Sequence, residues 1–302
     1  MEIAARGAAA LLLIAMPLAL GAYLVRHFKT GWRLFLIGAV IFAGSQLLHV
    51  PFNIYILTPF MAGLGFGTAD GPGLALAGAA VLLGLSAGVF EEGARWLAYR
   101  FWIRKARTWP EGVVFGSGHG GGEAVITGLI ALATLVQLTA LRGQDLSAIV
   151  PAEQLAAAEA QIETYWALPG WVFFLSAVER ASALAVQITL SVIVLQAFLR
   201  PRGGLWLLAA IGWHALVDAV AVFVGVSTGV YGASVRGTVI TELLIAGLAG
   251  ISLVFLFRLR PAGEADGRST LAPLPHTGPV TGVELGDDRL ASSRFSDQDE
   301  AK

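Results

Sequence analysis

The chain has 302 residues, of which 56% are hydrophobic and only 14% charged. This composition, with a mean hydropathy of +0.72, lies outside the range of soluble globular proteins and indicates a membrane protein. The formal net charge is −1, and no basic face suggests nucleic acid as a partner. The absence of cysteine excludes disulfides and thiolate metal sites, so any metal would be held by histidine and carboxylate side chains.

Apolar runs long enough to cross a bilayer recur along the chain. A membrane-spanning helix needs about 20 residues. The runs lie near residues 8–25, 32–50, 72–101, 111–141, 170–199, 205–226 and 238–257. We therefore predict an all-α fold, a polytopic transmembrane helix bundle of about seven spans that has the lipid bilayer as its partner.

Basic residues follow every second run. Lys and Arg concentrate in the cytoplasmic loops of membrane proteins. The basic clusters are Arg26, Lys29 and Arg33; Arg100, Arg104, Lys105 and Arg107; Arg200 and Arg202; Arg258 and Arg260. The intervening loops are neutral or acidic, with Asp70 in one and Asp145, Glu153, Glu159 and Glu163 against Arg142 in another. This alternation predicts a multi-pass protein of a bacterial cytoplasmic membrane with its N-terminus outside and its C-terminus in the cytoplasm.

Two segments allow an alternative topology. Residues 51–66 are apolar enough for another short span, but an extra span would invert every later loop, so we predict a kinked or re-entrant extension after Pro51. The first run follows Arg6 and could instead be a signal peptide.

The chain divides into a helical bundle and a polar tail. We predict the bundle over residues 1–260, with an extracytoplasmic amphipathic helix inside the segment 144–167. Residues 261–302 are rich in Gly, Pro, Ser and Asp, and we expect a disordered cytoplasmic tail, with His276 solvated.

Ionisable side chains interrupt the apolar runs, where each costs roughly 2.5–3.5 kcal/mol and therefore needs a partner or a function. They are Glu91, Glu92 and Arg95; His119 and Glu123; Glu179 and Arg180; His214 and Asp218; Glu242; and His49. A rise of about 1.5 Å per residue puts Glu91, Glu92, His119 and His214 all about 15 Å from the cytoplasmic surface. These four side chains are therefore predicted to meet in one cluster.

Several of these residues are spaced four apart and share a helix face. Glu123 follows His119 at this spacing, and Asp218 follows His214, so each carboxylate can fix the tautomer of its histidine. Arg95 can compensate one of the two adjacent glutamates and leave the other available as a base.

Glycines surround His119 in the stretch FGSGHGGGEA. Gly112, Gly116 and Gly120 form one row of small residues, and Gly118 with Gly122 forms a second, which lets neighbouring helices approach closely. The alternative is that the glycines loosen the helix and admit water or a substrate strand.

Three motifs in order carry a family resemblance. EEGAR at 91–95, FGSGH at 115–119 and HALVD at 214–218 resemble the superfamily of CAAX proteases and bacteriocin-processing enzymes. Within it, GHGGGEA and the Glu179–Arg180 pair look most like the YhfC family of intramembrane metalloproteases. The resemblance covers roughly residues 40–245 and implies hydrolysis of peptide bonds in membrane-associated protein or peptide substrates.

The motifs also depart from those of the prenyl-protein CAAX enzymes. Two residues separate Glu92 from Arg95 instead of three, with Trp96 where their arginine would be, and Asp218 replaces an asparagine. The shortened form is closer to the PrsW and YhfC branches, so prenylated substrates do not carry over with the chemistry.

The predicted mechanism is hydrolysis by activated water. Glu91 or Glu92 acts as the general base on a water that His119 also orients, and His214 with Asp218 stabilises the oxyanion. Zn²⁺ is the natural metal, with His119, His214 and Glu92 as ligands, while a metal-free glutamate mechanism stays open.

Supporting roles are predicted for Arg95, Glu123 and Asp218. Glu179 and Arg180 lie about 30 Å from the cytoplasmic end of their run and are predicted to form an ion pair or to serve an outer cavity. His49, with Gln46 nearby, is predicted to hydrogen-bond between helices.

Two non-proteolytic functions compete. A proton- or ion-coupled transporter component could use the same buried cluster, and a scaffold could use it only to fix helix packing. A transporter predicts paired broken helices in corresponding halves of the chain, and the sequence has one glycine-rich break without a counterpart. The sequence leaves the substrate and the oligomeric state open.

Overall fold

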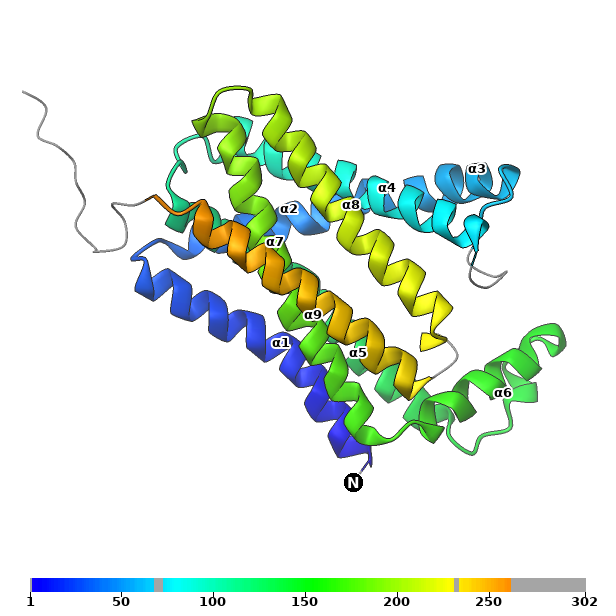
Figure 1. The fold of residues 1–302 in the computed structure, drawn as a ribbon. Helices are drawn as coiled ribbons and strands as arrows, with labels where there is room; N and C mark the ends of the chain where they lie inside the picture. The colour runs from blue at the N-terminus through cyan, green and yellow to red at the C-terminus, as the bar shows by residue number, and fades with distance from the viewer. Residues whose placement is uncertain (1, 68–72, 231–233, 262–302) are drawn as a thin grey trace, which may run out of the picture. The chain divides into compact units, whose positions relative to one another are not determined.

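A computed structural model describes residues 2–67, 73–230 and 234–261, in which every regular element is a helix (Figure 1). The α-helices are α1 (Glu2–His27), α2 (Trp32–Phe52), α3 (Thr58–Gly63), α4 (Leu74–Leu97), α5 (Trp109–Leu141), α6 (Ala152–Ala167), α7 (Leu175–Leu199), α8 (Gly203–Ser227) and α9 (Val235–Arg258). Asn53–Leu57 and Ala98–Trp102 are π-helical, and Leu146–Ala148 and Gly170–Phe174 are 3₁₀-helical. The predictions for Asp70 and for the tail beyond Pro261 lie outside the described residues.

The predicted membrane spans are confirmed. Seven helical stretches in the described part of the chain are long and apolar enough to cross a membrane: Glu2–His27, Trp32–Gly63, Leu74–Trp102, Trp109–Leu141, Gly170–Leu199, Gly203–Ser227 and Val235–Arg258. The segment after Pro51 belongs to the second stretch, continuing α2 through the π-helix into α3, so it is an extension and adds no span. The orientation of the bundle stays a prediction.

α7 is the central helix of the bundle. In its most apolar window 72% of the residues are buried, against 44% or less in the other six stretches. It packs against α5, α9, α8, α1 and α4. Any polar side chain on α7 is therefore held between several other helices, which matters for the site described below.

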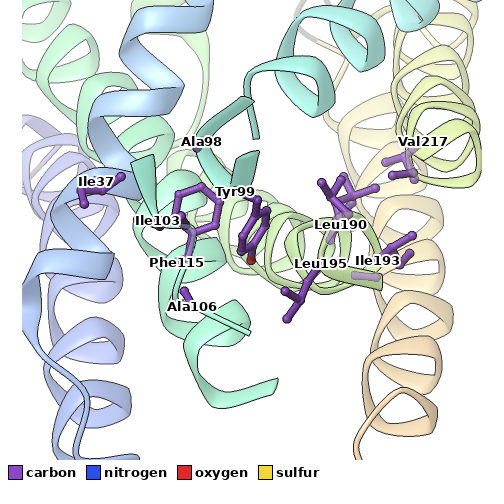
Figure 2. Close-up of a cluster of buried hydrophobic side chains, with 14 residues drawn as sticks. Ile37, Ala98, Tyr99, Ile103, Ala106, Phe115, Leu190, Ile193, Leu195 and Val217 are labelled. Atoms are coloured by element: carbon purple, nitrogen blue, oxygen red, sulfur yellow. The ribbon is translucent and has the colours of Figure 1, made fainter. Parts of the chain in front are cut away.

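The core beside α7 is apolar and aromatic (Figure 2). Tyr99 and Phe115 pack edge to face with ring centroids 5.0 Å apart, and Leu190 and Leu195 of α7 belong to the same cluster. The Tyr99 hydroxyl donates a hydrogen bond of 3.2 Å to the Ser191 carbonyl. Lipid tails are as apolar as leucine, so tight van der Waals packing, and not transfer from water, is what holds these helices together.

The glycines of α5 permit two close helix contacts, as the two rows predict. A Cβ atom added at Gly118 would lie 1.9 Å from the Phe35 carbonyl oxygen of α2. One added at Gly116 would lie 2.7 Å from the Ile188 Cα of α7. The helix is continuous through this stretch, so the glycines serve packing, and the alternative of a loosened helix is wrong for this structure.

The predicted amphipathic helix of segment 144–167 is present as α6, and none of its residues is buried. Arg6 of α1 holds the C-terminal end of α6 against the bundle. Its guanidinium donates hydrogen bonds of 3.1 Å and 2.7 Å to the carbonyl oxygens of Tyr165 and Leu168. The Arg6 side chain is only 2% exposed. α1 itself packs along α5 and α7 as an integral helix of the bundle.

Candidate active site

Two glutamates of α4 and two histidines from different helices meet inside the bundle. His119 Nε2 of α5 lies 3.1 Å from Glu91 Oε2, and His214 Nδ1 of α8 lies 2.7 Å from Glu92 Oε1. All four are buried, with exposed fractions of 6% for Glu91, 3% for His214 and 0% for Glu92 and His119. The four residues that the helix rise places at one depth therefore do come together.

The adjacent glutamates reach different helices because consecutive residues of an α-helix point about 100° apart. Glu92 faces α8, which approaches α4 closely at Gly84 and Gly88. A Cβ atom at Gly84 would lie 2.4 Å from the Ala215 carbonyl oxygen of α8. Small residues thus set the α4–α8 distance that brings His214 to Glu92.

Arg95 forms ion pairs with both glutamates, and the pair with Glu92 is the closer one. Its guanidinium Nη1 donates to Glu92 Oε1, whereas Nη2 lies 3.8 Å from Glu91 Oε2 and donates to Gln187 Oε1. Arg95 is fully buried. The positive charge therefore compensates Glu92 most strongly, while the hydrogen bonds of Glu91 come from two amides and an imidazole.

One predicted pairing is wrong. His119 makes no hydrogen bond to Glu123, because the Glu123 carboxylate accepts hydrogen bonds from Arg180 and Gln187 of α7 instead. A guanidinium is a stronger donor to a carboxylate than an imidazole is, so α7 takes this side chain away from His119. Asp218 does lie near its histidine, with Oδ2 3.5 Å from His214 Nε2.

Glu179 and Arg180 form the predicted ion pair on α7. Arg180 also reaches Glu123 of α5. The pair does not touch the four central residues, as their separation along the helix predicts, but a side-chain amide connects the two groups. Gln187 Nε2 donates to Glu123 Oε2 at 3.0 Å and to Glu91 Oε2 at 3.3 Å.

Sequence reasoning missed Gln187. The residue is 6% exposed, and its oxygen accepts from Arg95 while its amide nitrogen donates to two carboxylates. This set of partners fixes the orientation of the amide, since a flipped amide would set nitrogen against a guanidinium. The available signal is an amide in the apolar run of 184–195, where polar side chains serve contacts between helices.

The donor set fits a metal in its chemistry. His119 donates its Nε2 proton to Glu91, so the neutral ring keeps a lone pair on Nδ1, which is buried and makes no hydrogen bond within the described residues. Glu92 Oε2 is buried and unpartnered in the same sense. Imidazole and carboxylate are ligands that zinc prefers. In the described ranges no three such residues already converge on one point, so a bound ion would require side chains of the site to rotate.

A crevice opens beside the site between α2 and α4. Its volume is about 320 Å³, and its lining includes Gly44, Ser45, Phe90 and Gly93. Ser45 and Phe90 directly precede Gln46 and Glu91 in sequence. The crevice therefore lies along the same turns of α2 and α4 as the site, although Glu91 itself is not part of its lining.

Fold and site together define a multi-pass membrane protein with a buried glutamate–histidine centre. Residues 11–243 match the profile of a family described as YhfC intramembrane metalloprotease. A relative from Bacillus subtilis (strain 168), described as an uncharacterized membrane protein YhfC, is 31% identical over 272 residues, which cover 85% of this chain and 95% of the relative. The chain belongs to the YhfC family. No solved structure matches it.

Proposed function

We propose that this protein is an intramembrane metallopeptidase that hydrolyses peptide bonds of membrane-associated protein substrates. The observation that carries the proposal is the contact of Glu91 with His119 beside the contact of Glu92 with His214, with all four side chains buried inside the bundle. Ionisable residues inside a membrane bundle mark functional sites by default. The family description agrees with this class of enzyme.

Glu91 is the general base in this proposal. It is the more exposed of the two glutamates and lies farther from the Arg95 guanidinium than Glu92 does. Its carboxylate takes the proton of the attacking water while the water oxygen bonds to the scissile carbonyl carbon, and the same proton can later pass to the leaving amine nitrogen. His119 holds Glu91 in place through its Nε2 hydrogen bond.

His214 and Asp218 are proposed to stabilise the negative charge on the carbonyl oxygen. The ring donates from Nδ1 to Glu92 and has Asp218 3.5 Å from Nε2, so carboxylates on both sides favour a charged imidazole beside the reacting group. Asp218 is 40% exposed at its side chain, which keeps this edge of the site open.

In the metal-bound form of the proposal the ligands would be His119 Nδ1, Glu92 Oε2 and a neutral His214 ring, so the charged His214 ring described above belongs to the metal-free form. Zn²⁺ bound there would supply Lewis acidity toward the scissile carbonyl and the attacking water. Without metal, Glu91 and His119 would activate the water alone, which remains a separate form of the same proposal.

Substrate approach is proposed through the crevice between α2 and α4. The crevice is lined mostly by apolar side chains, as a segment arriving from the lipid requires, and its lining residue Phe90 is the neighbour of Glu91 in sequence. The order of the three motifs on α4, α5 and α8 further supports a relation to the CAAX protease superfamily.

The competing proposal is a transporter component that uses the same residues. Transporters typically bind their ions at broken helices, whereas α5 is continuous through its glycines. The test is to compare the fragments of membrane proteins in cells that carry wild type or Glu91→Gln. Fragments that vanish in the variant support proteolysis, and identical fragment patterns would remove it.

A further inference from the structure

A chain of hydrogen bonds leads from Glu91 along α2 and ends on α4. Gln46 Nε2 lies 3.0 Å from Glu91 Oε1, and His49 Nδ1 lies 3.3 Å from Gln46 Oε1. The chain continues from His49 Nε2 to Asn53 Nδ2 at 3.0 Å and from Asn53 Oδ1 to the Ser86 hydroxyl at 2.7 Å. The mechanism proposed above uses none of the last four residues.

The carboxylate at one end fixes the direction of every bond in this chain. An ionised carboxylate only accepts, so Gln46 must present its nitrogen to Glu91 and its oxygen to His49. His49 must then donate from Nδ1, and a neutral ring accepts at Nε2 from the Asn53 amide. The Asn53 oxygen accepts from Ser86, so all four donors point toward Glu91.

Two features of the fold hold His49 in this arrangement. Its ring stacks on Phe90 of α4, with centroids 5.2 Å apart and an angle of 26° between the planes. Asn53 is the first residue of the π-helical segment Asn53–Leu57, and such segments occur often at functional sites because they displace side chains from regular helix positions. His49 is 8% exposed, so water does not compete freely for the ring.

We propose that Gln46, His49, Asn53 and Ser86 form a positioning relay for Glu91, with His49 in the neutral tautomer that carries its proton on Nδ1. Bonds that all run in one direction polarise one another and strengthen the last bond, which is the one that Gln46 donates to Glu91 Oε1. Glu91 Oε2 is thereby left to His119 and Gln187. The relay residues touch no substrate and act through the carboxylate.

The tautomer of His49 is the direct test. Nitrogen NMR of histidine-labelled full-length protein in lipid bilayers distinguishes Nδ1–H, Nε2–H and doubly protonated rings, and His49→Phe assigns the signal by its loss. His49→Asn serves for assignment if the phenylalanine variant does not accumulate. The relay requires Nδ1–H in the wild type. A proton on Nε2, alone or with Nδ1, would overturn it.

The second readout is the carbon signal of the Glu91 carboxylate, identified by its loss in Glu91→Gln. Gln46→Leu should shift this signal, and His49→Asn should shift it in the same direction although His49 does not hydrogen-bond to Glu91. Gln196→Leu is the matched control, because Gln196 is a buried amide of α7 that bonds the Val192 carbonyl, outside the relay. A Glu91 signal that does not move when His49 is changed would contradict the relay.

The catalytic meaning of the relay rests on the proposed function, but neither NMR readout does. If wild type and Glu91→Gln give identical fragment patterns while His49 carries its proton on Nδ1 and both shifts appear, the proposed function fails and the relay stands. If Glu91→Gln abolishes proteolysis and His49 carries a proton on Nε2, the relay fails alone.

Discussion

Glu92 and Arg95, one turn apart on α4, form an ion pair in which both side chains are fully buried. A buried ion pair compensates its own charges, and neither partner is then free for proton transfer. The adjacent Glu91 is bound by neutral amides and an imidazole instead. This difference in partners supports the separate roles that we propose for the two glutamates, the second in structure or metal binding and the first in proton transfer.

This division predicts opposite effects of two isosteric changes. Glu92→Gln leaves the Arg95 charge buried without its partner, and such a loss costs about 3–5 kcal/mol. Glu91→Gln keeps the side-chain shape and loses only hydrogen bonds from neutral groups, so it should change stability less while lowering proteolysis by about 10²–10⁴-fold. Thermal unfolding of both variants in detergent measures the difference. Equal destabilisation by the two changes would contradict the assignment.

The proposed ligands predict zinc that depends on both histidines. Purified wild type should contain about one zinc per chain, and His119→Ala and His214→Ala should each lower it strongly. His27→Ala is the control, because His27 ends α1 at an exposed position. Mass spectrometry of protein purified without added metal gives the zinc content. Zinc that persists in both variants would place the ion elsewhere.

Gln187 should matter for turnover more than for folding. Its amide joins Glu91 to the Glu123–Arg180 pair, and partners of this kind typically contribute 10–100-fold to activity. Gln187→Leu should therefore lower kcat by about 10–100-fold at nearly unchanged KM. Gln196→Leu, on the same helix, should leave kcat unchanged. Equal kinetic losses in the two variants would mean that buried amides of α7 act only through helix packing.

The α2–α5 contact should not tolerate a methyl group at Gly118. The added Cβ would lie 1.9 Å from a backbone oxygen of α2, so one helix must move, at a cost of about 1–3 kcal/mol or more. Gly247→Ala on α9 is the control, because no atom lies within 4 Å of its added Cβ. The unfolding temperature should fall for Gly118→Ala and should stay equal or rise for the control. A stable Gly118→Ala protein would contradict the close packing.

Filling the crevice between α2 and α4 should block substrates without harming the fold. Gly44 lines the crevice, and a Cβ atom added there meets no atom within 4 Å, so the side chain of Gly44→Trp can start into the crevice. The rate of proteolysis of membrane-protein substrates should fall, while the zinc content and the unfolding temperature should match those of wild type. Gly247→Trp, which also has open space, is the control. Full activity of Gly44→Trp would show that substrates arrive by another route.

Helix rise and hydropathy predicted much of this arrangement, because both depend only on position along the chain. They gave the seven spans and the common depth of Glu91, His119 and His214. They could not give the direction in which each side chain points around its helix, since this depends on how the helices pack. For that reason the pairing of His119 with Glu123 was wrong and Gln187, which α7 inserts beside Glu91, was missed.

The most direct test of the central claim is whether the protein hydrolyses a peptide bond with Glu91 as its base. A substrate found by the fragment comparison would be reconstituted with purified protein in lipid vesicles in water enriched in heavy oxygen, and the products weighed by mass spectrometry. The account predicts a new carboxyl terminus that carries heavy oxygen with wild type and no such product with Glu91→Gln. The same labelled product from both proteins would contradict it.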